Sequence, residues 1–153
     1  MGVQEVKKYF QERNLNYEIR EFEVSTATVE LAAQALGVEP GMIAKTMSFK
    51  SKDNGSLLVI AAGDKRVDNR KFKDTFKTKG SMLSAEEVGE LTGHPVGGVC
   101  PFALRHELPV YLDVSLQAYA YVYPAAGSPN SAVKMTPADL AKVTGGTWVD
   151  VCK

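Results

Sequence analysis

The sequence has no excess charge of either sign. Eighteen Lys and Arg residues balance eighteen Asp and Glu residues, so the formal net charge of the 153-residue chain is zero. A strongly basic nucleic-acid binder of the histone type needs a large positive excess, so that class is excluded and we expect no DNA partner. Glycine and proline, at 13 and 7 residues, are too few for a fibrous or disordered chain. We therefore expect one folded domain over residues 1–153.

Long hydrophobic runs are absent as well. A membrane-spanning helix needs about 18 consecutive apolar residues, and the sequence has no such stretch. Residues 1–6 also lack the charged-then-apolar order of a signal peptide. These absences predict a cytoplasmic protein with no membrane partner.

Soft metal ligands are scarce. The chain has two cysteines, Cys100 and Cys152, and two histidines, His94 and His106. The cysteines form no C-x-x-C pair, and we expect reduced thiols, although the sequence leaves a disulfide open. The standard nucleotide-binding, metalloprotease and serine-hydrolase motifs are also missing. We expect neither a metal site nor a cofactor.

The spacing of apolar residues predicts interleaved helices and strands. Helical periodicity and capping residues predict helices over residues 3–13, 29–36, 68–77 and 84–91, and a last helix from Thr136 and Pro137 onward. Runs of β-branched and aromatic residues predict strands over residues 17–22, 43–50, 56–62, 109–113, 119–123, 131–135 and 147–151. The Asn54-Gly55 pair between two of these runs predicts an antiparallel hairpin. The irregular alternation indicates an α+β fold, a curved or barrel-like mixed sheet with helices packed around it.

Lys45 is the first candidate for chemistry, because it stands inside the apolar run 43–49. A lysine in such a run can line a pocket and hold an anion or a polarised carbonyl oxygen. Burial would also lower its pKa toward the range of a general base. The alternative is a lysine at a strand end whose stem packs while its ammonium reaches water, and spacing alone favours that alternative.

Two glycine-containing loops are further candidates. In residues 97–101, Gly97 and Gly98 allow a close backbone approach, and free N–H groups there suit a carbonyl oxygen or a developing oxyanion. A tight structural turn explains the same residues equally well. Cys100 has no neighbouring histidine in sequence, which favours packing over a nucleophilic role. In residues 125–131, small residues, a hydroxyl and an amide suit one wall of a pocket, but Gly-Ser-Pro-Asn is also ordinary turn chemistry, which the sequence alone favours.

A local basic segment lies between Asp64 and Lys79. Seven positive and three negative residues give this segment a charge of +4, so the rest of the chain carries −4. Such a face can steer RNA without tight nonspecific binding, although a solvated helix face is the ordinary explanation of a charge run. The residues that we expect to contact RNA are Lys65, Arg66, Arg70, Lys71 and Lys73.

The chain resembles the YbaK/EbsC family, relatives of the editing domain of bacterial prolyl-tRNA synthetases. The resemblance is collinear and covers essentially the whole chain. It is carried by residues 25–27, 35–38, 43–46, 63–68, 91–102, 108–113 and 139–141. It implies the YbaK-like fold and trans-editing, the hydrolysis of the ester that joins a wrong amino acid to tRNA.

The resemblance also implies roles for individual residues. Lys45 is expected to be the essential active-site residue, with no metal and no enzyme nucleophile, and a water, the terminal hydroxyl of the tRNA or the substrate's own side chain would supply the attack. The substrate-binding residues are expected to be Phe22, Thr46, Gly97, Gly98, Val99, Cys100, Pro101, Gly127, Ser128 and Asn130. The partners are expected to be tRNA, bound transiently through its acceptor end, and an aminoacyl-tRNA synthetase.

Departures from the family pattern bear on specificity. The cysteine-clearing branch has Tyr at the position of Phe22. It also has a Gly-Lys-Arg-Gly stretch where this chain has residues 127–130, and a following Asp where this chain has Ala132. Residues 101–104 are closer to the alanine-clearing branch. We expect a small amino acid such as Ala, Ser or Cys on tRNA-Pro or a similar tRNA, with the departures weighing against Cys. A noncatalytic tRNA- or synthetase-binding module and a hydrolase of small esters are the alternatives.

Overall fold

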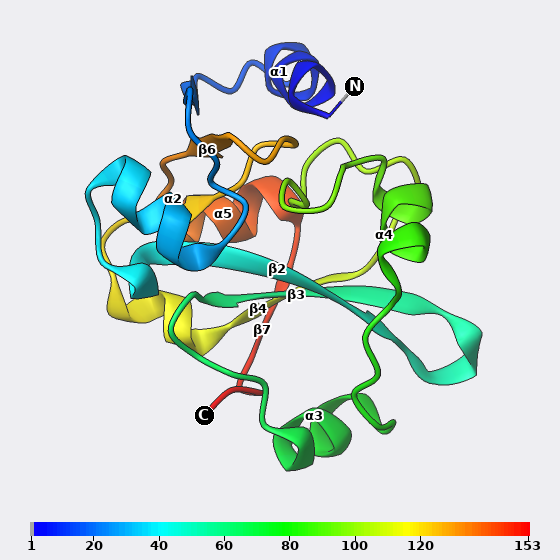
Figure 1. Ribbon diagram of the computed structural model, residues 1–153. Coiled ribbons are helices and arrows are strands. Elements are labelled where there is room, and N and C mark those ends of the chain that lie inside the picture. The colour runs from blue at the N-terminus through cyan, green and yellow to red at the C-terminus, as the bar shows by residue number, and fades with distance from the viewer. Residues whose placement is uncertain (1) are drawn as a thin grey trace.

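The computed structural model describes residues 2–153 (Figure 1). Its helices are α1 (Val3–Glu12), α2 (Val29–Leu36), α3 (Asn69–Phe76), α4 (Ala85–Thr92) and α5 (Pro137–Thr144), with short 3₁₀ turns η1 (Pro40–Met42), η2 (Lys52–Asn54) and η3 (Val114–Ala118). Its strands are β1 (Ile19–Glu21), β2 (Ile43–Lys50), β3 (Ser56–Ala62), β4 (Val110–Asp113), β5 (Tyr123–Pro124), β6 (Ser131–Val133) and β7 (Thr147–Val149). No helix in this range is long and apolar enough to cross a membrane.

The strands form a mixed sheet of five in the order β5-β2-β3-β4-β7, with a separate antiparallel pair, β1 and β6. Within the larger sheet β2 and β3 are antiparallel, whereas the other neighbours are parallel. Helices lie on both sides of this sheet (Figure 1). The expected α+β fold with a mixed sheet is confirmed.

The helix ends follow from local sequence. Thr28 caps α2 by accepting a hydrogen bond from Leu31 N, and Thr136 caps α5, which begins with proline. Ser84 and Glu87 form a reciprocal capping box on α4. Each such cap pairs backbone N–H groups that a helix start leaves without a partner.

The β2–β3 hairpin is confirmed, but its turn differs from a two-residue Asn-Gly turn. The left-handed residues are Asp53 and Asn54, with φ of 66° and 63°, whereas Gly55 has an extended backbone. Asp and Asn tolerate this region better than other residues with a side chain.

The strand expected over residues 119–123 is wrong for most of its length. The η3 turn ends where Tyr119 N donates to Leu116 O, and the chain pairs again only at Val122, which forms a single bridge with Met135. The strand itself is Tyr123–Pro124. Tyr119 and Ala120 lie in a bend, and no strand among residues 2–153 pairs with them.

Residues alternate between the two faces of the sheet. Leu58 and Ile60 belong to the larger core, which also contains Phe10 of α1. Val59 and Ala61 face the other way, into a smaller core closed by Phe72 of α3. Helix α3 therefore covers one face of the sheet. The site described next lies along the edge of β2.

Candidate active site

A cavity of about 310 Å³ lies beside β2. Its wall is contributed by residues 26–29 and Ala32, by β2 residues 43–48, by Met82, Leu83, Ala85 and Val88 near α4, by Val96, Gly97 and Val99, and by Tyr123, Ala125, Ser131 and Ala132. Most of these side chains are small and apolar. Met82 and Val96, on the wall, are 60% and 69% exposed.

The cavity exists because β2 has a partly unpaired edge. Strand β5 pairs with β2 only at Ile43 and Ala44. At the other end Leu83 N donates to Ser48 O (3.1 Å), and Lys50 N donates to Ser81 O (2.8 Å).

Backbone groups of alternate residues in an antiparallel strand point to the same edge. Those of Thr46 therefore point to the edge used by Ser48 and Lys50. Within residues 2–153 no strand pairs with Thr46 on that side, so its N–H and C=O groups are available to a ligand.

Two hydroxyl groups on the cavity wall are also without partners. Thr26 Oγ1 and Thr46 Oγ1 are buried, and neither forms a hydrogen bond within the described residues. Thr46 was among the expected binding residues. Thr26 was missed, because the sequence marks the run Ser25–Thr28 only as a source of helix caps, and Thr28 alone serves as the cap.

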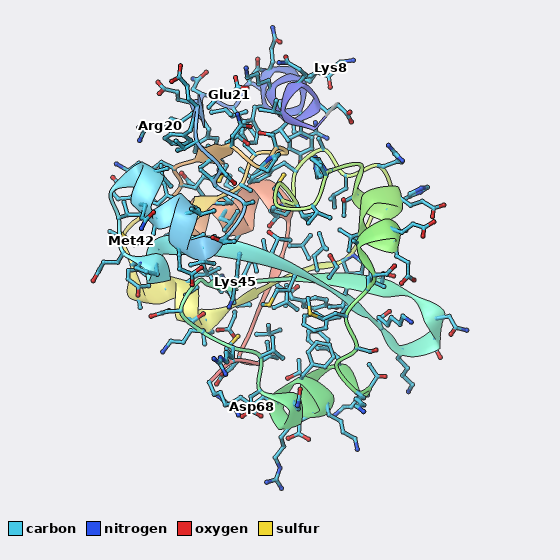
Figure 2. The ribbon with its side chains drawn as sticks, viewed as in Figure 1. Lys8, Arg20, Glu21, Met42, Lys45 and Asp68 are labelled. Carbon is cyan, nitrogen blue, oxygen red and sulfur yellow. The ribbon has the colours of Figure 1, made fainter. Side chains whose placement is uncertain are left out.

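Lys45 lies on the same wall, but its ammonium is already engaged. It donates hydrogen bonds to the main-chain carbonyls of Gly63, at 3.4 Å, and Lys65, which follow the end of β3. Figure 2 shows Lys45 below β2, between that strand and the loop that leads to α3. Burial lowers the pKa of Lys45, while the neighbouring Cys152 and Asp64 act in the opposite direction. An ammonium has three N–H donors, so one remains beyond these two contacts.

The glycines of the 97–101 loop allow close packing. A Cβ on Gly98 would lie 2.5 Å from Ser128 N, and one on Gly97, where φ is +85°, would lie 2.8 Å from Ala27 Cβ. Gly127 N donates to Gly98 O (3.1 Å). The two glycine loops therefore lie directly against each other.

The 97–101 residues do not all reach the cavity. Gly97 and Val99 are on its wall, whereas Cys100 is fully buried in the larger core, with its Sγ atom 3.6 Å from His94 Nε2. Burial raises the pKa of Cys100 to about 12, which keeps the thiol protonated at neutral pH.

Residues 127–130 lie next to the cavity wall but do not line it. Ser128 Oγ donates to Asn130 Oδ1 (2.8 Å), and Asn130 Nδ2 donates to Phe22 O (2.9 Å). The residues that do not line the cavity include Phe22, Gly127, Ser128 and Asn130. Ser131, which follows Asn130, does line it. The Phe22 ring lies 5.1 Å from the guanidinium carbon of Arg20.

The predicted RNA-contacting residues fall in two places. Lys65 and Arg66 are exposed on the loop whose carbonyl binds Lys45. Arg70 and Lys73 are exposed on α3, which packs on one face of the sheet through Phe72. Lys71 is bound to Asp150 Oδ1 (3.1 Å) and Cys152 O (2.9 Å), so it already has a structural role.

The cavity wall contains no Asp, Glu, His or Cys residue among those that the structure describes. Across residues 2–153, no cluster of three or more His, Cys, Asp or Glu residues is arranged to hold a metal ion. Lys45 is the charged group on the wall. The arrangement can bind and polarise a substrate through N–H and O–H donors.

The sequence is similar to those of a known protein family and of two named proteins. Residues 23–143 match the family described as the aminoacyl-tRNA editing domain. The protein YwhH of Bacillus subtilis, whose name gives no activity, is 47% identical over 154 aligned positions, which cover 100% of this chain and 98% of YwhH. EbsC of Enterococcus faecalis, named as a candidate Cys-tRNA(Pro)/Cys-tRNA(Cys) deacylase, is 26% identical over 125 positions, covering 81% of this chain and 76% of EbsC.

A solved structure extends the likeness to the whole fold. The crystal structure of a candidate trans-editing enzyme for prolyl-tRNA synthetase superimposes with a TM-score of 0.91 and 32% sequence identity, over 99% of this chain and 96% of that one. The match to the family covers all of the residues that line the cavity. The chain belongs to the aminoacyl-tRNA editing domain family, in its YbaK/EbsC-like deacylase branch.

Proposed function

We propose that this protein is a trans-editing deacylase, a single editing domain over residues 1–153 that hydrolyses the ester of mischarged tRNA. The ester would join a small amino acid, such as Ala, Ser or Cys, to tRNA-Pro or a similar tRNA. The observation that carries the proposal is the cavity beside β2. It brings the unpaired Thr46 backbone, Lys45 and the 97–99 loop together in a chain of the editing family.

The proposed chemistry rests on electrostatic stabilisation. Attack on an ester carbonyl places negative charge on its oxygen, and fixed N–H donors stabilise that charge. Gly98 N donates to Pro95 O, whereas the N–H groups of Gly97 and Val99 form no hydrogen bond within residues 2–153. We assign these two groups, with Thr46 N–H, as donors to the ester.

Lys45 would be the anchor. Its two carbonyl partners fix the ammonium, and the third N–H would donate to an oxygen of the substrate. The described part of the wall offers no carboxylate or imidazole to act as a base. We propose that a water activated by the vicinal hydroxyl of the terminal ribose attacks the ester carbonyl. The bond from the carbonyl carbon to the ribose oxygen then breaks, the ribose oxygen takes a proton, and the free amino acid is released.

The tRNA would bind transiently. Lys65, Arg66, Arg70, Lys71 and Lys73 are the basic residues proposed to contact its backbone. An aminoacyl-tRNA synthetase would be a further partner, and the cytoplasm the compartment where the substrate is made. The near balance of charge over the whole chain favours release of the deacylated tRNA.

The test is a panel of tRNAs charged with Ala, Ser, Cys and the cognate amino acid. We expect the small noncognate esters to be hydrolysed well above their spontaneous rate, and Lys45→Ala to abolish the effect. Lys50→Ala is the matched control, since Lys50 is exposed at the far end of the same strand. Saturable binding of the charged tRNA without any turnover would instead identify a noncatalytic binding module.

A further inference from the structure

Thr26 and Thr46 stand out among the polar side chains of the cavity. Thr26 is 7% exposed, Thr46 is partly buried, and the hydroxyl oxygen of each is buried without a hydrogen-bond partner within residues 2–153. Two other hydroxyls of the wall do have partners: Thr28 Oγ1 accepts from Leu31 N, and Ser131 Oγ accepts from Ser128 Oγ. Among the described residues of the wall, Thr26 and Thr46 are the two whose hydroxyl oxygens are both buried and unpaired.

The backbones of both threonines are held in place beside the cavity. Thr26 N donates to Pro129 O at 2.6 Å, which holds this part of the chain against the 127–131 loop. Thr46 is fixed by its pairing with Ile60 in the β2–β3 ladder. A threonine side chain has few staggered positions, so each hydroxyl has few alternative placements.

An unpaired buried hydroxyl lowers the stability of the folded protein, because it has lost its hydrogen bonds to water. The protein has two such groups on the wall of one small cavity despite this loss of stability. Their position points to a polar ligand group that pairs with them. Each hydroxyl donates one hydrogen bond and accepts others. A ligand hydroxyl, which also does both, can pair with a threonine hydroxyl as donor or as acceptor.

Other small substrate side chains are poor hydrogen-bond partners for these two threonine hydroxyls. A methyl group forms no hydrogen bond and would leave both oxygens orphaned, and a thiol is a weak donor and acceptor. Four alanines of the wall, Ala27, Ala32, Ala44 and Ala132, leave room for a small side chain. A site built to pair with a hydroxyl rejects analogues that lack it.

We propose that Thr26 and Thr46 recognise the side-chain hydroxyl of the substrate, so that the protein selects seryl esters over alanyl and cysteinyl esters. This inference rests on the proposed deacylase function and names its substrate class. An alanyl or cysteinyl ester would leave these buried hydroxyls without a good partner. This corresponds to a selectivity for the seryl ester of about 10- to 100-fold.

The first test compares seryl and alanyl esters of the same tRNA with Thr26→Val and Thr46→Val. Valine keeps the shape of threonine and replaces its hydroxyl with a methyl group. We expect the wild type to prefer the seryl ester by 10-fold or more. Each variant should lose about 10-fold in the ratio of kcat/KM for the seryl ester to kcat/KM for the alanyl ester.

Thr147→Val, on an exposed position of β7, is the control for the substitution itself. Thermal unfolding of all three variants checks that the fold is kept. Equal losses on both esters would overturn the proposal, since they would mean that the hydroxyls bind the α-amino group that both substrates share. Equal hydrolysis of the two esters by the wild type would overturn it as well.

A binding measurement separates this inference from the deacylase function. The probes are 3′-seryl-amino-3′-deoxyadenosine and its alanyl counterpart, whose amide bonds are not hydrolysed. We expect the wild type to bind the seryl probe at least 10-fold more tightly, and Thr26→Val to remove the difference, even if no ester is turned over. Equal affinities would overturn the proposed recognition, whereas a retained preference without turnover would overturn only the proposed deacylase activity.

Discussion

The ammonium of Lys45 donates a hydrogen bond to the carbonyl of Gly63, 3.4 Å away, across the end of the β2–β3 pair. A second bond, to the Lys65 carbonyl, fixes the same group. The lysine is thus oriented by main-chain atoms and not by an acidic side chain. Its remaining N–H donor is the feature on which the proposed catalysis depends.

Replacement of Lys45 by alanine should remove this donor. We expect a loss of about 10²- to 10³-fold in kcat, the effect of deleting one donor to a developing oxyanion. Single-turnover hydrolysis of mischarged tRNA measures it, with Lys50→Ala alongside. A Lys45→Ala rate within twofold of wild type would show that the lysine does not act on the ester.

The contact between the glycine loops should matter for stability. A Cβ on Gly98 would meet the Ser128 backbone at 2.5 Å, so Gly98→Ala should cost about 1–3 kcal/mol of unfolding free energy. This corresponds to a melting temperature lower by roughly 2–12 °C for a chain of this size. Thermal unfolding followed by circular dichroism measures it.

Gly89→Ala is the matched control for that substitution. Gly89 lies inside α4, and the nearest atom to an added Cβ is 4.0 Å away. Because alanine favours helix more than glycine does, this change should stabilise the protein by about 0.5–1 kcal/mol. If both variants shifted stability in the same direction, the close packing at Gly98 would not be the cause.

The buried thiol of Cys100 should make stability depend on pH. The folded protein holds this pKa at about 12, whereas an unfolded thiol titrates near about 8.5. Between these values the unfolded state binds fewer protons, so the free energy of unfolding decreases as pH rises. Urea unfolding at pH 8 and pH 10 should show this decrease, and Cys100→Ala should reduce it. A wild-type slope that the substitution leaves intact would assign the effect to other groups.

The basic residues of α3 should contribute to RNA affinity through charge alone. We expect Arg70→Glu and Lys73→Glu each to raise KM for charged tRNA and to reduce its salt dependence by about one unit of log–log slope. Lys52→Glu, in the η2 turn, is the control. Lys71 is unsuited to this experiment because reversing its charge breaks its bond to Asp150. No change in KM for either α3 variant would show that the tRNA approaches by another surface.

Much of the fold was predictable because its signals are local. The caps at Thr28, Ser84 and Thr136 and the alternation in residues 43–62 each depend on a few neighbouring residues. The wrong strand over 119–123 illustrates the limit, since its composition favours a strand but the chain has no partner there. Pairing depends on distant segments, which composition does not reveal.

The site was predictable only in outline. Lys45, Thr46, Gly97 and Val99 do meet at one cavity. The orphan hydroxyl of Thr26 depends on how residues 25–28 pack between the two glycine loops, and the burial of Cys100 depends on contacts with the larger core. The carbonyl partners of Lys45 come from backbone atoms, whose position no side-chain pattern encodes.

Hydrolysis of tRNA-Pro charged in turn with Ser, Ala and Cys is the most direct measurement of the central claim. Wild-type protein should release at least one of these amino acids 10-fold or more above the spontaneous rate, with serine released fastest, and Lys45→Ala should return the rate to background. Release of all three at the spontaneous rate, with tRNA-Pro and with similar tRNAs, would contradict the proposed deacylase function.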